Sequence, residues 1–325
     1  MMQSPNASHS ISDHFTRAFH ALCEVAEAYY YLGRLGDALE ILQTALQLVA
    51  AKEVQPRDHV MLLLQYGKIL VANYFLTNKD FGLTFIKLQE AKRLAEEIQD
   101  EKGIADALSL LGQVYYNKKL NTGEGDYEQA LGYFQQALEL RERLRDTRGI
   151  SEALFYSGLT YEQRNLHDRA LVYYTDALQF AELYNHKLEK SFALRHLAGI
   201  AWHKGDLDAA LNYALTSLAL REEVGFRRYL PFSHLLVGDI YQARNDQESA
   251  LSHYQNAQAL AEEMNIKSAL VFSLLALGDI QLAQQDLTQA QENFEHAQAL
   301  AKELQITYAI DAAHKRLSAE GVRKL

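Results

Sequence analysis

Apolar residues in this chain recur at intervals of three and four positions, in stretches that are separated by short polar breaks. Around residue 165 two such stretches follow one another: Leu154, Phe155, Leu159 and Tyr161, then Leu171, Tyr174, Leu178 and Ala181. This spacing places apolar side chains on one face of a helix. The pattern therefore predicts two amphipathic helices joined by a short turn.

The breaks carry residues that suit a tight turn between helices. The central break positions are Asn165, Gly205, Asn245 and Gln285. Gly and Asn favour the left-handed backbone that ends a helix, and Asp next to them can cap the following helix. Each pair of stretches is therefore predicted to be a helical hairpin.

The hairpins repeat with a fixed period. Gly158, Gly238 and Gly278 fall on a 40-residue grid whose remaining point is Ala198, and each is followed by an alanine twelve residues later. The same frame continues upstream, with extra residues at 74–81 and 117–125, which gives seven units. Because one hairpin cannot bury its apolar face alone, such units stack into a continuous array. The sequence thus predicts an all-α repeat fold.

This spacing of small, aromatic and alanine positions resembles the tetratricopeptide repeat, over roughly residues 13 to 320. The resemblance implies a right-handed α-solenoid of about seven hairpins plus a C-terminal capping helix. Three features depart from the usual signature: the period is 40, the terminal proline is absent, and tryptophan does not occupy its usual place. The longer period is similar to the variant in kinesin light chains, bacterial peptide-pheromone receptors and the sensory arms of some bacterial transcription regulators.

The repeat frame also sets the expected domain organisation. Residues 1–11 are polar and are expected to be disordered, and residues 12–305 are expected to form one superhelical domain of seven repeats. Residues 306–325 are expected to form a capping helix and tail whose polar face carries Asp311, Lys315, Arg316 and Arg323. Such a cap would cover the apolar side of the last repeat.

Composition and charge narrow the class of partner. The formal net charge is −10, which argues against nucleic acid because phosphate binding depends on a basic face. The single cysteine, Cys23, rules out an internal disulfide framework and fits a reducing compartment. The N-terminus has no apolar run typical of a secretory signal, and the apolar stretch 60–76 contains Gln65, Lys68 and Asn73. We therefore expect a cytoplasmic protein without a membrane span.

The sequence contains no motif that indicates catalysis. The glycines fall on repeat positions and form no phosphate loop, and neither a GxSxG nor a CxxC motif is present. His196 and His203 are seven residues apart on one helical face but have no third candidate ligand, so no metal site is expected. We expect a protein that is not an enzyme and needs no cofactor.

The family resemblance implies that the first helix of each hairpin lines a concave surface. Ten residues at inward positions form the candidate peptide- or protein-binding site: Tyr116, Phe155, Tyr156, Glu162, Arg195, His196, Trp202, His203, Leu235 and Asp239. Over the whole array these positions also hold seven acids, Glu24, Glu27, Asp106, Glu152, Glu162, Asp239 and Asp279, against the two fixed cations Lys68 and Arg195. The expected partner is a protein segment with apolar and basic residues.

Several alternatives stay open at this point. Phe192, Phe232 and Phe272 recur in phase, which suits packing between repeats as well as ligand contact. The extra residues at 74–81 and 117–125 could form a second contact site or simply lengthen helices. The leading function is a protein-interaction adaptor. The alternatives are a sensory module that changes superhelical shape on binding a small peptide or metabolite, and a self-assembling structural protein, which the polar C-terminal helix argues against. The oligomeric state is left open.

Overall fold

The computed structural model describes residues 10–77 and 79–318, and within them the chain is built from α-helices and two short 3-10 helices. The chain divides into two compact units, residues 1–166 and residues 167–325. Each unit has apolar cores of its own.

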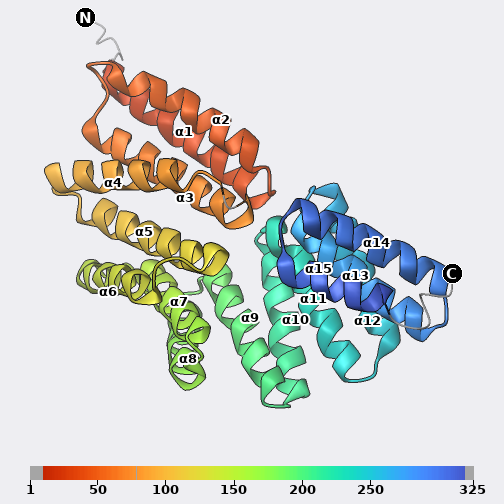
Figure 1. Cartoon of the computed structure of the whole chain (residues 1–325). Coiled ribbons are helices and arrows are strands. Elements are labelled where there is room, and N and C mark those ends of the chain that lie inside the picture. Colours follow the sequence, from red (N-terminus) through yellow and green to blue (C-terminus); the bar gives the residue numbers. More distant parts are fainter. Residues whose placement is uncertain (1–9, 78, 319–325) are drawn as a thin grey trace, which may run out of the picture. The chain divides into compact units, whose positions relative to one another are not determined.

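Unit 1 is a stack of helical hairpins, drawn in red to yellow-green in Figure 1. Each helix packs against the next, and the first helices of successive hairpins also touch one another, which is the contact pattern of a solenoid. Its helices are α1 (Ile11–Tyr31), α2 (Leu35–Gln47), the 3-10 helix η1 (Leu48–Ala50), α3 (Pro56–Thr77), α4 (Phe81–Glu97), α5 (Glu101–Thr122), α6 (Tyr127–Leu144) and α7 (Thr147–Gln163).

Unit 2 repeats this arrangement, from green to blue in Figure 1. Its last helix packs against both α13 and α14, in the place that the first helix of another hairpin would take. The helices are α8 (His167–Leu183), α9 (Lys187–His203), α10 (Leu207–Glu223), the 3-10 helix η2 (Arg227–Tyr229), α11 (Leu230–Ala243), α12 (Gln247–Glu263), α13 (Lys267–Ala283), α14 (Leu287–Glu303) and α15 (Thr307–Leu317). The prediction of an all-α solenoid of hairpins with a final capping helix is confirmed.

The turns have the predicted backbone chemistry. Asn165, Asn245 and Gln285 have φ values of 59°, 62° and 66°, and Gly205 has a φ of 81°. Gly205, Asn245 and Gln285 are each followed directly by an aspartate. The side chain of this aspartate accepts a hydrogen bond from a backbone N–H in the first turn of the second helix. A left-handed residue thus ends one helix, and an Asp N-cap starts the next.

The small residues of the grid mark places where two helices of one hairpin come close. A Cβ atom built on Gly278 would lie 2.4 Å from Cε1 of Phe294, and one on Gly238 would lie 2.5 Å from Cε1 of Tyr254. Both distances are too short for a real contact, so the ring fills the space that the glycine leaves. The interpretation of these glycines as close-approach positions is therefore confirmed.

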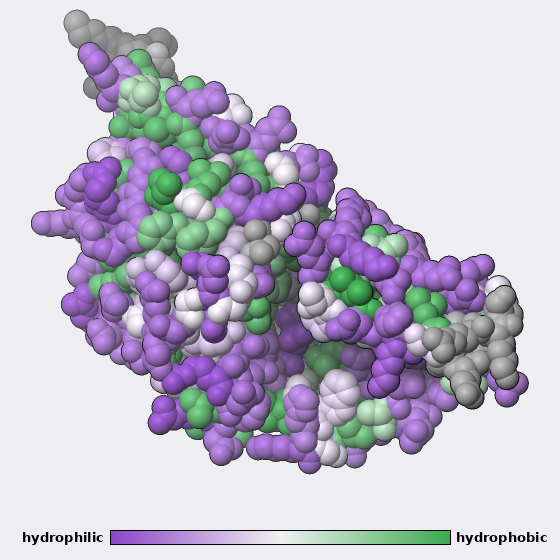
Figure 2. Space-filling model, viewed as in Figure 1, coloured by the Kyte–Doolittle hydropathy of each residue, from purple (hydrophilic) through white to green (hydrophobic). Residues whose placement is uncertain are grey.

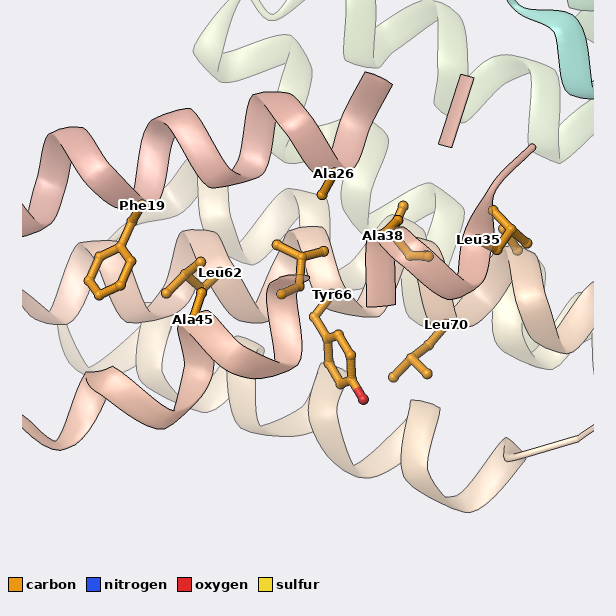
Figure 3. Close-up of a cluster of buried hydrophobic side chains, with 11 residues drawn as sticks. Phe19, Ala26, Leu35, Ala38, Ala45, Leu62, Tyr66 and Leu70 are labelled. Carbon is orange, nitrogen blue, oxygen red and sulfur yellow. The ribbon is translucent and has the colours of Figure 1, made fainter. Parts of the chain in front are cut away.

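The first hairpin and the following helix share one apolar core, shown in Figure 3. Phe19 and Ala26 of α1 and Leu42 of α2 have no exposed surface, and they pack with Leu62 and Tyr66 of α3. Because the core is made jointly by successive hairpins, each hairpin is stabilised by its neighbour.

The extra residues of the second and third repeats lengthen helices. Helix α3 continues to Thr77 and α5 to Thr122, and each has 22 residues, compared with 17 in α7, α9 and α13. Nδ2 of Asn121 lies 3.5 Å from the backbone oxygens of Tyr74 and Phe75, so the extended ends of α5 and α3 contact each other. Of the two interpretations, the structure favours the longer helix; a second contact site there stays a prediction.

Helix α3 is long and apolar enough to cross a membrane by length and composition. Just over half of its most apolar window, 56%, is buried in the structure, as in a core helix of a helical protein. At the N-terminus, Ser10 caps α1 and Ile11 is its first helical residue, so the helix begins within the segment 1–11 that was expected to be disordered. Residues 1–9 lie outside the described part, as does Arg323 in the expected polar face of the capping helix.

Candidate functional site

The face of the molecule seen in Figure 2 is mostly hydrophilic, with patches of hydrophobic residues between the hydrophilic ones. The first helices of the hairpins, α5, α7, α9, α11 and α13, carry the candidates that the sequence singled out.

In unit 1 the candidate residues are mainly packed. Tyr116 of α5 and Phe155 of α7 are buried, with 6% and 7% of their surface exposed. Tyr156 is half-buried: its ring stacks on Phe134 at a centroid distance of 5.3 Å and meets Phe155 edge-on at 5.3 Å. Glu162, near the end of α7, is also half-buried. Within this unit, Tyr156 and Glu162 have the surface that a ligand could touch.

In unit 2 the candidates on α9 are more accessible. Arg195, His196 and Trp202 are half-buried, and His203 is exposed. Nδ1 of His196 lies 3.3 Å from the hydroxyl of Tyr174, and Nε2 accepts a hydrogen bond from Arg195 at 3.3 Å. These contacts bring the cationic side chain of Arg195 and two aromatic rings together on one side of α9.

On α11, Leu235 is buried with 8% of its surface exposed, whereas Asp239 is half-buried. The candidates on α5 and α7 belong to unit 1 and those on α9 and α11 to unit 2. Each set is therefore described within its own unit, and the role of both sets in binding stays a prediction.

The three in-phase phenylalanines pack between successive repeats: Phe192 and Phe272 meet rings at the start of the following repeat, and Phe232 packs against Ala261, Ile266 and Ala269. The ring of Phe192 lies 5.7 Å from that of Phe226, the ring of Phe232 lies 6.1 Å from that of Tyr229, and Phe272 stacks on Tyr308 at 5.8 Å. Such offset and edge-on pairs stabilise the contact between repeats. Of the two interpretations, the structure favours packing.

Four of the seven acids counted as inward-facing form ion pairs, and two of the cations that bind them, Arg141 and Arg316, were not in the count. Nζ of Lys68 lies 2.7 Å from Oε1 of Glu27. Asp106 and Glu152 are bound by Arg141, which lies on the second helix of its hairpin and is 5% exposed. The predicted excess of acids is therefore smaller than the sequence suggested, in part because Arg141 lies on a second helix and only first-helix positions were counted.

Asp279 shows how an arginine binds at one inward position. Nε and Nη2 of Arg316, on the capping helix α15, each lie 2.6 Å from an oxygen of the Asp279 carboxylate. This two-point geometry is the strongest that a carboxylate makes with a side chain. No sequence motif predicted this ion pair, because the two residues lie 37 positions apart in different repeats.

Asp239 is the equivalent of Asp279 one repeat earlier, but it lacks the cation. The place that corresponds to Arg316 is taken by Ala276, which has no charge to offer. Within the described residues the side chain of Asp239 accepts a hydrogen bond from the Tyr254 hydroxyl at 2.8 Å and forms no ion pair. Burial raises the pKa of Asp239 to about 6, although the Tyr254 hydrogen bond acts in the opposite direction. At neutral pH this carboxylate is charged, and a positive ligand group would stabilise it.

A histidine pair that sequence reasoning missed joins α11 to α12. Nδ1 of His234 lies 2.9 Å from Nδ1 of His253, and the ring of Tyr241 stacks on His253 at 5.6 Å. His234 is buried, and burial, together with the neighbouring His253, lowers the pKa of His234 to about 4. At a pH between about 4 and 6.5, the ring of His234 is therefore neutral in the folded protein, whereas it would be protonated in the unfolded chain.

We expect this pair to make the stability of the chain sensitive to acid. The pKa of His234 is lower in the folded state, so its contribution is complete above pH 6.5 and is lost as the pH falls towards 4. Between pH 7 and pH 5 the loss from His234 alone should be about 2 kcal/mol. Urea unfolding at both pH values measures it. The His234→Gln variant should lose clearly less between the two pH values; an equal loss would contradict this assignment.

The described residues contain no group of three or more His, Cys, Asp or Glu side chains placed to hold a metal ion. Cys23 is half-buried, and burial followed by the charge of Glu27 raises the pKa of its thiol to about 11. The thiol is therefore protonated at neutral pH and poorly suited to act as a nucleophile.

Comparison with known proteins agrees with this architecture. The sequence model of the tetratricopeptide repeat matches residues 120–182 and 190–263. A Rap protein solved in complex with Competence and Sporulation Factor is 17% identical, with 96% of this chain and 97% of that chain covered and a TM-score of 0.59. At these identities such likenesses show the fold alone.

Two further solved structures have similar folds. One is a signal-transduction ATPase with a tetratricopeptide repeat sensor from Pyrococcus horikoshii, at 16% identity, with 93% of this chain and 46% of that chain covered and a TM-score of 0.58. The other is aspartyl phosphate phosphatase F from Bacillus subtilis, at 11% identity, with 99% and 97% covered and a TM-score of 0.54. The comparison with curated proteins gave no match.

Proposed function

Because the chain is a tetratricopeptide repeat protein, we propose that it binds a segment of another protein on the first helices of its hairpins and catalyses no reaction itself. Stacked hairpins place side chains that are distant in the sequence on one surface, which suits an extended or helical segment. The bound segment would carry a basic residue together with apolar ones.

The observation that carries this proposal is the contrast between Asp239 and Asp279. The two carboxylates occupy the same position in successive repeats, and Asp279 is bound at two points by Arg316. Asp239 has only the hydroxyl of Tyr254. The Arg316–Asp279 pair supports a guanidinium or ammonium group of a partner side chain as the group that binds Asp239.

The aromatic surface on α9 supplies the apolar part of the site. Trp202 is half-buried, and its ring stacks on the exposed His203 at a centroid distance of 6.3 Å. A tryptophan with one covered and one accessible side is a common anchor in protein interfaces. Trp202 and Asp239 belong to the same unit, and we propose that one segment contacts both.

A second candidate is a sensory module that binds a short signalling peptide. It is favoured by the similarity in fold to the Rap protein that was solved with Competence and Sporulation Factor. This candidate uses the same residues and differs in the consequence of binding, which is a change in the shape of the array. Small-angle scattering with and without a bound peptide would separate it from an adaptor of fixed shape.

The experiment that tests the proposal is selection of a displayed random-peptide library on the immobilised full chain. We expect the retained peptides to be enriched in Lys or Arg flanked by apolar residues. Trp202 is the only tryptophan, so its emission should shift when a selected peptide is added. The Asp239→Asn variant should bind the selected peptides about tenfold more weakly, the loss of one charged hydrogen bond, and Trp202→Ala should also weaken them.

Asp168→Asn is the matched control, because it removes an exposed acid from α8, a second helix of the same unit. It should leave affinity unchanged. Circular dichroism must show that all variants remain folded. Selected peptides without a basic residue, or equal affinity of wild type and Asp239→Asn, would contradict the proposal.

A further inference from the structure

Arg221 is a buried cation that has no carboxylate among its described bonding partners. It lies in the last turn of α10 and exposes 1% of its surface. Nη1 donates to Oγ of Ser233 at 2.6 Å, and Nε donates to Oγ of Ser191 at 3.3 Å. The guanidinium also lies over the rings of Phe192 and Tyr229, 5.5 and 5.7 Å from their centroids. Among the described residues no carboxylate bonds to it.

Arg141, two periods earlier, shows what such a position normally requires. Its guanidinium lies 3.0 to 3.3 Å from three carboxylates, those of Asp106, Asp146 and Glu152. Counted in the repeat frame, the positions around Arg221 that correspond to these three acids are all phenylalanine: Phe192, Phe226 and Phe232. The arginine is kept while all three of its acids are replaced by aromatic rings.

A second arginine on the neighbouring helix α9 bonds to an imidazole nitrogen and not to a carboxylate. Arg195, on α9, is half-buried and donates to Nε2 of His196 at 3.3 Å. Burial first, and then the charge of Arg195, lower the pKa of Arg221 to about 9. Arg195 follows Ser191, a hydrogen-bond partner of Arg221, by one turn of α9. Among the described residues neither arginine forms an ion pair with an acid.

Two neighbouring cations that form no ion pair with an acid among the described residues make an environment in which an anion is stabilised. Arg195 has accessible surface, whereas Arg221, which bonds to Ser191 one helical turn earlier on α9, is buried. A buried charge is screened less by water and salt than an exposed one, so Arg221 strengthens the attraction without touching the ligand. The rings of Phe192 and Tyr229 add an apolar surface beside the charges.

We propose that Arg195, assisted by the charge of Arg221, binds the side-chain carboxylate of an Asp or Glu in the partner segment. This proposal rests on the proposed function, since it assigns a second contact to the same segment. The segment would then present a basic residue to Asp239 on α11 and an acidic group to Arg195 on α9. Arg195 is the contact residue and Arg221 a positioning residue that acts through its charge.

An array of short synthetic peptides tests this directly. Each peptide carries one Arg and one Glu in a Leu, Ala and Phe framework, at varied spacing and in both orders, and each has a twin with Gln in place of Glu. For the best binders we expect wild type to prefer Glu over Gln by about tenfold, the value of one charged contact. This preference should fall to below about twofold in Arg195→Gln and in Arg221→Met.

The ratio of Glu to Gln affinity separates recognition from folding, because a variant that only destabilises the protein weakens both twins equally. Arg244→Gln, an exposed arginine of the same unit that pairs with Asp208, is the matched control and should keep the full ratio. Asp239→Asn should weaken both twins and leave the ratio intact.

The outcomes distinguish the two proposals. A wild-type ratio near one, with binding that still depends on Asp239, would overturn the carboxylate site and leave the proposed function standing. A ratio that persists in both arginine variants would also overturn it. If no peptide of the array binds, both proposals are contradicted. Recovery of the ratio in Arg195→Lys, which restores a cation, would support the site further.

Discussion

Replacing Arg141 with methionine is expected to lower the free energy of unfolding by about 3 to 5 kcal/mol. The guanidinium of Arg141 is 5% exposed and holds Asp106, Asp146 and Glu152 within 3.3 Å. Without it, three carboxylates with similar charge would face one another in a partly buried space. The loss of one partner from a buried ion cluster costs far more than the loss of an exposed pair, because the remaining charges stay poorly solvated.

The same substitution at Arg221 is expected to leave stability unchanged or to raise it. Arg221 has no acid to release, and methionine can fill the apolar space between Phe192 and Tyr229. The serines that bind Arg221 would not be left without partners, since Ser191 Oγ also donates to the carbonyl of Leu188 and Ser233 Oγ to that of Tyr229. A buried charge kept at a cost to stability is typical of a residue retained for binding.

Urea unfolding followed by circular dichroism measures both changes. Arg143→Met is the control: Arg143 is 65% exposed and pairs with Glu101, so its loss should cost less than about 1 kcal/mol. Arg141 and Arg221 lie in different units, and hydrogen exchange would show in which unit each variant opens. A loss at Arg221→Met as large as that at Arg141→Met would show that Arg221 serves the fold, and would contradict the expected contrast.

The second large effect is expected at the crossing of α13 and α14. Gly278→Ala should lower stability by roughly 1 to 3 kcal/mol, because the new Cβ would lie 2.4 Å from the fully buried ring of Phe294. In the first hairpin the same two positions are Ala26 and Leu42, both fully buried. Where the first hairpin has alanine in place of glycine, the side chain that packs against it is leucine, which is smaller than phenylalanine.

The double variant Gly278→Ala with Phe294→Leu copies the pair of the first hairpin. Phe294→Leu alone should also destabilise the protein, since it leaves space beside Gly278. Together the two changes should cost less than the sum of the single changes, by about 0.5 to 3 kcal/mol, because the alanine methyl group enters the space that the ring vacates. A thermal-unfolding cycle of the four proteins measures this coupling. Strictly additive effects would mean that the two side chains do not share one space.

Much of the fold could be predicted because it follows local rules that repeat. Asn245 and Gln285 occupy turns whose position was set by the pattern of apolar residues, and both have the left-handed backbone that was expected. Gly238 was assigned to a close helix crossing, and the ring of Tyr254 fills the space above it. Each of these features depends on residues within one hairpin, so its spacing is visible in the sequence.

The candidate site was only partly predictable, because its electrostatics come from residues in other repeats or on second helices. Asp239 was identified as an inward-facing acid, but its contrast with Asp279 depends on Arg316, 37 residues further on. Asp106 was counted as an acid open to a ligand, whereas Arg141, on the second helix of the same hairpin, binds it. Only the folded chain shows which of these charges meet.

The sequence by itself determined the helical hairpins, their number, their turns and their small-residue crossings, since a fixed period imposes the same local packing on every unit. The tertiary structure decided which charges are paired and which are left for a partner. Pairing depends on distances of a few ångströms between side chains of different helices, and a shift of one helical turn would change the partner. Arg141 and Arg221 show the difference: they occupy the same position in the repeat, yet one lies among three carboxylates and the other among aromatic rings.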